Sequence, residues 1–309
     1  MRIALLRRGL GAAAAVALTC ATTLTGVGTA QAATPKGHHE AKGHHEAVDV
    51  KLTAHGIEAP DAAEDGLVHF HISTDNPQGR QLQVFRPHEG VTLDTVLADL
   101  TKAINETDPA TSAAGINAFN ADAEALGGGF ASPNIPVDVT EPITPGTVYL
   151  LDFSAFLADP AHPVVKALQL CPDDGDKDLA PFPRGIVIQE EQAAGPRFRT
   201  EDVDKADAPI LVHNAADEIH EMAIQPVKPG TTDDDVQAFF DALAHGQQPP
   251  PPPFTGPPSG LGAISPDHTA LVQAKHLPAG TYVLLCFIPD DQTGIPHAFE
   301  GMHKVVVLS

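Results

Sequence analysis

The chain has 309 residues, enough for two domains of ordinary size, with 42% hydrophobic and 5% aromatic residues. Trp is absent, whereas 29 Pro and 26 Gly favour short strands and many turns over a helical bundle. The formal net charge of −22 argues against nucleic acid and anionic lipid as partners, because the chain repels phosphate groups. A basic protein or a cationic small species is compatible with this charge.

Residues 1–32 are typical of an export signal peptide. Three arginines precede an apolar stretch over 10–24, and an Ala-x-Ala cleavage pattern ends at Ala32. A membrane anchor is the alternative, but the stretch is short and rich in Thr. A lipid attachment at Cys20 is a second alternative, disfavoured by the Thr before it. We therefore expect a secreted, extracellular protein without membrane insertion after cleavage, and loss of the three arginines would change the net charge from −22 to −25.

Residues 33–47 contain a perfect hexapeptide repeat, too short to bury a core, which predicts a disordered His-rich tail. Its four imidazoles, interleaved with Glu, are candidate ligands for Cu²⁺, Zn²⁺ or Ni²⁺: His38, His39, His44 and His45. The alternative is a solvated tail with incidental metal affinity.

The remainder contains an internal repeat. Residues 86–96 match 226–236, and residues 146–153 match 280–287, in the same order and with offsets of 140 and 134 positions. We therefore expect tandem copies of one fold over 48–172 and 185–309. An acidic stretch between them, 173–178, fits a linker.

Each copy is predicted to be mostly β, with helices as insertions. Strand composition is found, in chain order, over 67–73, 82–86, 148–153, 210–214, 222–227, 282–288 and 304–308. Apolar residues at helical spacing predict one helix over 93–104, a second over 116–126 and a third over 236–243. Thr92 and either Thr231 or Thr232 are the expected N-caps. The Pro-rich segment 249–258 is predicted to be a stiff surface loop.

Four residues of the second copy have the chemistry of a mononuclear copper site. Such a site uses two imidazoles and one thiolate in a plane, with a weak axial thioether. Cys286 ends a strong strand, His297 and Met302 follow it with His-x4-Met spacing, and His220 comes six residues after the strand end at Asn214.

This order resembles the cupredoxin family of blue, type 1 copper proteins, which includes plastocyanin-like domains. The resemblance covers about residues 185–309 and implies an all-β architecture, two tandem Greek-key β-sandwich domains. It further implies that His220, Cys286, His297 and Met302 bind one copper ion, and that Asn214 ties the two ligand loops together. The spacer between Cys286 and His297 has ten residues, longer than in the shorter family members.

Two other roles for Cys286 stay open. After signal cleavage only Cys171 and Cys286 remain, so they could form one disulfide in an oxidising compartment. Cys286 could also be a buried, inert thiol.

The first copy lacks the metal-binding pattern. Asp152 stands at the position of Cys286, Arg80 at that of His220 and Thr74 at that of Asn214. His162 roughly matches His297, but Ala167 replaces Met302, which makes this copy a degenerate one without a blue-copper site.

The sequence also argues against a multicopper oxidase. That class needs several His-x-His pairs and a His-Cys-His unit, whereas this chain offers His69 and His71 and flanks Cys286 with Leu285 and Phe287. Two surface histidines on one strand face are the simpler reading of the pair.

We therefore expect a mononuclear copper protein used for one-electron transfer or extracellular copper handling, with a redox or copper-exchange protein as partner. The alternative is a non-enzymatic binding or structural module whose metal site is vestigial. A copper-dependent oxidoreductase is a weaker third hypothesis, because the sequence shows no second metal site.

Overall fold

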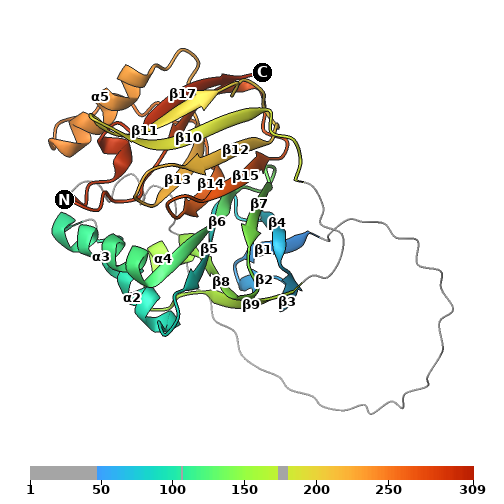
Figure 1. Ribbon diagram of the computed structural model, residues 1–309. Coiled ribbons are helices and arrows are strands. Elements are labelled where there is room, and N and C mark those ends of the chain that lie inside the picture. Colours follow the sequence, from blue (N-terminus) through green and yellow to red (C-terminus); the bar gives the residue numbers. More distant parts are fainter. Residues whose placement is uncertain (1–46, 106, 173–179) are drawn as a thin grey trace, which may run out of the picture.

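The computed structural model describes residues 47–105, 107–172 and 180–309 (Figure 1). The expected signal peptide (1–32), nearly all of the His-rich tail (33–46) and most of the acidic linker (173–179) lie outside the described residues. Within the described part, no helix is long and apolar enough to cross a membrane.

The described residues of the N-terminal half form nine strands and three helices. The strands are β1 (Val48–Thr53), β2 (Gly56–Glu58), β3 (Ala62–Glu64), β4 (Gly66–Thr74), β5 (Arg80–Pro87), β6 (Ala123–Ala131), β7 (Val137–Ile143), β8 (Gly146–Asp152) and β9 (Val165–Cys171). The helices are α2 (Leu93–Ala103), α3 (Pro109–Asp122) and α4 (Phe153–Ala158).

The C-terminal half repeats this order. Its strands are β10 (Gly185–Gln192), β11 (Gly195–Glu201), β12 (Ile210–Asn214), β13 (His220–Pro226), β14 (Ser259–Ile264), β15 (Thr269–Ala274), β16 (Gly280–Leu285) and β17 (His303–Leu308). Helix α5 (Asp233–Ala244) corresponds to α2, and a short 3-10 helix, η1 (His297–Phe299), follows β16.

The two halves share both of their sheets. One sheet has eight strands in the order β11-β10-β12-β15-β7-β4-β1-β2, and the other has nine in the order β17-β16-β13-β14-β6-β5-β8-β9-β3. Equivalent strands meet where the halves join, β15 with β7 and β14 with β6, both antiparallel. Apart from β3, each order runs through equivalent strands when read from either end, as expected of an internal repeat related by an approximate two-fold axis.

The all-β architecture of two tandem β-sandwich copies predicted from the sequence is confirmed, and the sheets of the two copies are joined into one continuous pair. Inward-facing side chains alternate along the strands, as in β4, where Val68, Phe70 and Ile72 are buried. One core cluster fills the space between the sheets and draws residues from both halves, from Val48 to Leu308. The helices cover the nine-stranded sheet with two smaller clusters, one beneath α2, α3 and α4 and the other beneath α5.

Capping explains where the predicted helices begin. The Thr92 hydroxyl accepts a hydrogen bond from the backbone N–H of Thr95, and Thr232 forms a reciprocal capping box with Asp235, so Thr232 rather than Thr231 is the N-cap. The expected helix over 116–126 is wrong at both ends, because α3 begins seven residues earlier, at Pro109. It stops at Asp122, because the next residues pair with β5 as strand β6.

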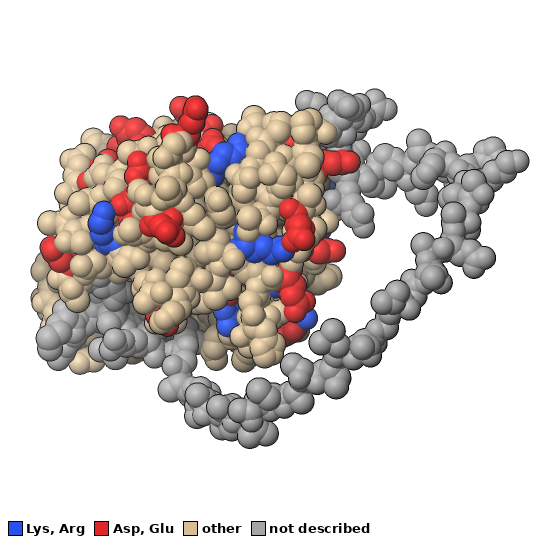
Figure 2. Space-filling model, turned by 90° about the horizontal axis from the view of Figure 1, so that it is seen from below, with Lys and Arg blue, Asp and Glu red and all other residues tan. Residues whose placement is uncertain are grey.

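Charged side chains are scattered on the face drawn in Figure 2, where acidic groups alternate with a few basic ones and no broad basic patch is visible. This distribution agrees with an excess of 40 acidic over 18 basic residues in the sequence.

Candidate metal centre

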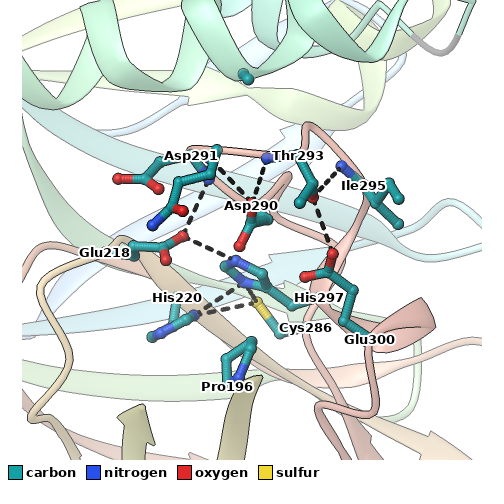
Figure 3. A network of polar contacts seen from close by, with 12 residues as sticks. Pro196, Glu218, His220, Cys286, Asp290, Asp291, Thr293, Ile295, His297 and Glu300 are labelled. Atoms are coloured by element: carbon teal, nitrogen blue, oxygen red, sulfur yellow. Dashed lines mark hydrogen bonds and ion pairs between the residues drawn. The ribbon is translucent and has the colours of Figure 1, made fainter. Parts of the chain in front are cut away.

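Cys286, His220 and His297 come together at one end of the C-terminal half (Figure 3). Cys286 follows β16, and His220 is the first residue of β13, the strand paired with β16. The register places Ala223 opposite Leu285, so Cys286 lies beside the first residues of β13. A bulge just after His220 interrupts the pairing with β14, and such irregularities redirect side chains at sheet ends. His297 opens η1 in the loop that leads from Cys286 to β17.

The candidate ligand atoms form a triangle. Nδ1 of His220 and Nδ1 of His297 are 3.0 Å apart, and Sγ of Cys286 lies 3.8 Å from the first and 3.4 Å from the second. The centre of a triangle with these sides is about 2.0 Å from each corner, and metal–N and metal–S bonds in proteins are about 2.0–2.3 Å. These residues therefore fit one metal ion at the centre of the triangle.

All three side chains are completely buried. Burial, reinforced by the positive charge of His297, keeps the pKa of His220 well below its usual value, so this imidazole is neutral and can bind a metal. Burial alone would also lower the pKa of His297, but the neighbouring Cys286 and Glu218 raise it to about 10. A metal ion must therefore displace a proton at His297, which ties metal binding to proton release.

A carboxylate orients His297 from the side away from the sulfur. Oε2 of Glu218 lies 3.0 Å from Nε2 of His297 and also accepts a hydrogen bond from the backbone N–H of Asp291 (Figure 3). A carboxylate bound to the outer nitrogen fixes the tautomer of a metal-binding imidazole, leaving Nδ1 free for the metal. Glu218 therefore links the segment before His220 to the loop that carries His297.

A second carboxylate supports Cys286. The backbone N–H of Glu221 points at the sulfur from 3.5 Å, and its side chain accepts a hydrogen bond from the backbone N–H of Phe287. The other oxygen of Glu221 accepts a hydrogen bond from Gln81 of the N-terminal half. Neither Glu218 nor Glu221 was predicted from the sequence, because no local pattern distinguishes them among 40 acidic residues.

Met302 ends the same loop. It is fully buried in the core cluster that also contains Cys286, and its backbone N–H donates to the carbonyl of His297. The preceding Gly301 has a φ of +99°, and a Cβ there would lie 2.9 Å from the guanidinium of Arg197. Arg197 in turn donates to the carbonyl of Glu300, so β11 holds this end of the loop.

Asn214 acts differently from the expectation based on the family resemblance. Its amide donates to the carbonyls of Glu218 and Ile264, and its oxygen accepts from the backbone N–H of Ala216. These bonds shape the segment before His220 and attach it to β14 rather than to the Cys286 loop. The expected tie between the two ligand loops is supplied by Glu218 and Glu221 instead.

In the N-terminal half an ion pair occupies the place of the metal centre. Arg80 and Asp152, the counterparts of His220 and Cys286, form a salt bridge, and the Asp152 side chain is 1% exposed. The other counterparts do not converge on this pair: His162 is exposed and contacts Asp159, and Ala167 is an exposed residue of β9. The described residues thus contain one His-Cys-His cluster, in the C-terminal half.

His69 and His71 lie on one face of β4, as predicted, and both contact the carboxylate of Asp138 on β7, at 3.5 Å and 2.7 Å. The ammonium of Lys275 is 2.9 Å from the same carboxylate. Burial would raise the pKa of Asp138, but these three partners outweigh it and hold that pKa well below its usual value. His69 and His71 therefore belong to an ion-pair cluster around Asp138. The positive charge of Lys275 in this cluster disfavours binding of a metal ion.

The two cysteines are not bonded to each other. Both are free, Cys286 buried beside the two imidazoles and Cys171 exposed at the end of β9. The disulfide alternative is therefore not realised. The tail histidines His38, His39, His44 and His45 lie outside the described residues.

Comparison with known proteins gave matches among solved structures alone: no family model and no curated protein matches the chain. Reduced auracyanin from Roseiflexus castenholzii matches 40% of this chain and 94% of its own, at 14% identity and a TM-score of 0.24. Reduced rusticyanin matches 40% and 78%, at 20% identity and a TM-score of 0.23.

Copper nitrite reductase from Nitrosomonas europaea matches 85% of this chain and 94% of its own, at 13% identity and a TM-score of 0.22. All three proteins have the cupredoxin fold. The C-terminal half resembles the cupredoxin family in the order of its candidate ligands. Identities and TM-scores this low carry no functional argument, so the assignment of the site rests on its own geometry.

Proposed function

We propose that this chain is a mononuclear copper-binding protein that transfers single electrons, with His220, Cys286 and His297 as in-plane ligands and Met302 as the axial ligand. The observation that carries the proposal is the triangle of Nδ1, Nδ1 and Sγ, whose centre has metal-bond distances to all three atoms. Two imidazoles and a thiolate with a weak thioether are the donor set preferred by type 1 copper.

Bound copper would supply exchange between the Cu(I) and Cu(II) states. The chain's own contribution is to hold the ligands in one arrangement for both states. Cys286 and His220 are fixed by paired strands, and helix α5 supports the loop of His297, with the rings of Phe240 and Phe299 4.8 Å apart. Complete burial of the three ligands excludes water from the centre.

Export and extracellular copper handling belong to the same proposal and are supported by the signal-peptide pattern of residues 1–32 and the His-rich tail. A redox partner or a copper-exchange partner follows from the proposed chemistry. The net charge of −22 favours a partner with a basic docking face.

The test is to add Cu²⁺ to the purified protein and record its visible spectrum. We expect a strong thiolate-to-copper band that is lost in Cys286→Ala and kept in Cys171→Ala, the matched control for an exposed thiol. Absence of the band, or a band that survives in Cys286→Ala, would contradict the proposal. The first of these results would leave a non-enzymatic module with a vestigial site as the better interpretation.

A further inference from the structure

Helix α3 of the N-terminal half lies against the ligand loop of the C-terminal half. The side-chain amide of Asn117 donates to the carbonyl of Asp291 over 2.5 Å and to that of Ala113 in its own helix over 3.0 Å. Asp291 belongs to the long spacer between Cys286 and His297. A residue of the half that lacks the copper ligands therefore reaches the loop that carries one of them.

The approach of the two segments is close enough to require glycine. A Cβ on Gly294 would lie 1.8 Å from the carbonyl oxygen of Pro109, the first residue of α3, and the φ of Gly294 is +68°. The spacer thus packs directly on the backbone at the start of α3.

A third contact comes from the other ligand segment. Ile219, between Glu218 and His220, is 2% exposed and buried in the same apolar cluster as Ile116 and Phe119 of α3. Helix α3 therefore contacts the spacer by a hydrogen bond and a close backbone approach, and it shares a buried cluster with the residue beside His220.

These contacts continue to the metal centre through one carboxylate. The backbone N–H of Asp291, whose carbonyl accepts from Asn117, donates to Oε2 of Glu218 over 3.1 Å. The same oxygen lies 3.0 Å from Nε2 of His297 (Figure 3). Asn117, Asp291, Glu218 and His297 thus form one chain of polar contacts from α3 to a candidate ligand.

We infer that α3 positions the copper ligand His297 from the N-terminal half, with Asn117 as the positioning residue and Glu218 as the group through which it acts. The inference rests on the proposed function. It gives the degenerate N-terminal half a role, because helix α3 covers the spacer and thereby fixes the imidazole of His297 in the C-terminal half. We call this cover of the spacer by α3 the roof. The counterpart of α3 in the C-terminal half is the Pro-rich segment 249–258, so the roof exists on one side of the molecule alone.

The experiment compares Asn117→Ala with Asn120→Ala in the full chain. Both residues are exposed on α3, but Asn120 has no hydrogen bond to the spacer, so it is a matched control for helix content and polarity. Competition with a chelator gives the Cu²⁺ affinity, and the visible spectrum gives the position of the thiolate band. Loss of outer partners of metal ligands typically costs about 10–100-fold in affinity, and we expect about 3–10-fold for the more distant Asn117, with a shifted band. Asn120→Ala should match the unmodified protein.

A double-mutant cycle with Glu218→Gln tests the route. If Asn117 acts through Glu218, Asn117→Ala should have little further effect in the Glu218→Gln background. An undiminished effect of Asn117→Ala in that background would overturn the route through Glu218.

Gly294→Ala offers a second disruption of the roof, with Gly246→Ala as its control. Gly246 has a similar φ of +63° but open space around its would-be Cβ, so it measures the backbone strain alone. We expect Gly294→Ala to shift the band and Gly246→Ala to leave it in place.

Equal affinities and spectra for Asn117→Ala and Asn120→Ala, with a normal band in the unmodified protein, would overturn the inference and leave the proposed function intact. No band in the unmodified protein would overturn both.

Discussion

At the residue scale, the two halves fill equivalent buried positions in two ways. Leu82 is paired with Asp152 in the N-terminal half, and in the C-terminal half Cys286 directly follows Leu285, which is paired with Ala223. In the C-terminal half the position holds a cysteine beside two imidazoles, and in the N-terminal half it holds an aspartate paired with a guanidinium. The pairing of Arg80 with Asp152 satisfies two charges that would each be costly to bury alone.

The ion pair of the N-terminal half is predicted to be needed for stability and not for metal binding. Asp152→Ala leaves Arg80, whose side chain is 17% exposed, without its partner and removes the cap on the backbone N–H of Ala155. We expect the free energy of unfolding to fall by about 3 kcal/mol, measured by urea denaturation, with the copper band unchanged.

The matched control is the double variant Arg80→Met with Asp152→Leu, which replaces the pair by apolar groups and should recover most of the loss. A single variant as stable as the unmodified protein would show that the ion pair contributes nothing to stability.

At the element scale, a charged cluster sits where the sheets of the two halves join. His268, just before β15, is 3.0 Å from Glu124 of β6 and 2.7 Å from the buried Glu141 of β7. Hydrogen bonds with these two carboxylates outweigh burial and raise the pKa of His268 to about 10 from an ordinary value of 6.5. The imidazolium thus links three strands at the junction.

This shift predicts how stability depends on pH. The folded state holds the proton of His268 more tightly than the unfolded state does. The contribution of the protonated His268 to the free energy of unfolding is therefore fully present below about pH 6.5 and is lost as pH rises through about 10. We expect the difference in free energy of unfolding between the unmodified protein and His268→Gln to shrink steadily between these limits. Urea denaturation at a series of pH values measures that difference, and a gap that stays constant or widens would be inconsistent with the raised pKa.

Local patterns predicted seven of the seventeen strands in the described residues and three of the helices. The strand over 210–214 was predicted with its bounds from apolar composition, and α2 and α5 were predicted from helical spacing and their Thr caps. The predicted boundary between α3 and β6 was wrong, because residues 123–126 have a helical pattern but form a strand. They do so by pairing with β5, which is a tertiary interaction.

The candidate ligands His220, Cys286 and His297 were predicted by type and order, but their support was not. Glu218 and Glu221 act through bonds to residues more than 60 positions away. The spacer contacts Asn117, which lies 174 positions before the carbonyl of Asp291 that accepts its hydrogen bond. Such contacts leave no periodicity or spacing in a single sequence, so they depend on the folded structure.

At the scale of the whole molecule, the pairing of β15 with β7 and of β14 with β6 makes two continuous sheets. Core residues from both halves belong to one cluster, and Gln81 of the N-terminal half bonds to Glu221 beside the metal centre. Neither half buries its edge strands and its share of this core without the other. The two halves should therefore unfold together, although the sequence presents them as tandem copies.

The chain contains two tyrosines and no tryptophan, which allows this cooperativity to be tested directly. Tyr149 lies in β8 of the N-terminal half and Tyr282 in β16 of the C-terminal half, so Tyr282→Phe and Tyr149→Phe each leave one reporter. Far-UV circular dichroism on the same samples measures how much each substitution changes the overall stability. After correction for that change, the remaining tyrosine of each variant should report the same urea midpoint.

Copper makes the same test sharper, because the proposed ligands all lie in the C-terminal half. A ligand at 100 times its dissociation constant stabilises the folded state by about 2.7 kcal/mol, and in a cooperative molecule this stabilisation reaches every residue. Copper should therefore raise the midpoint reported by Tyr149 as much as that reported by Tyr282. A shift confined to Tyr282 would mean that the halves unfold independently, and that the shared sheets do not couple the N-terminal half to the metal centre.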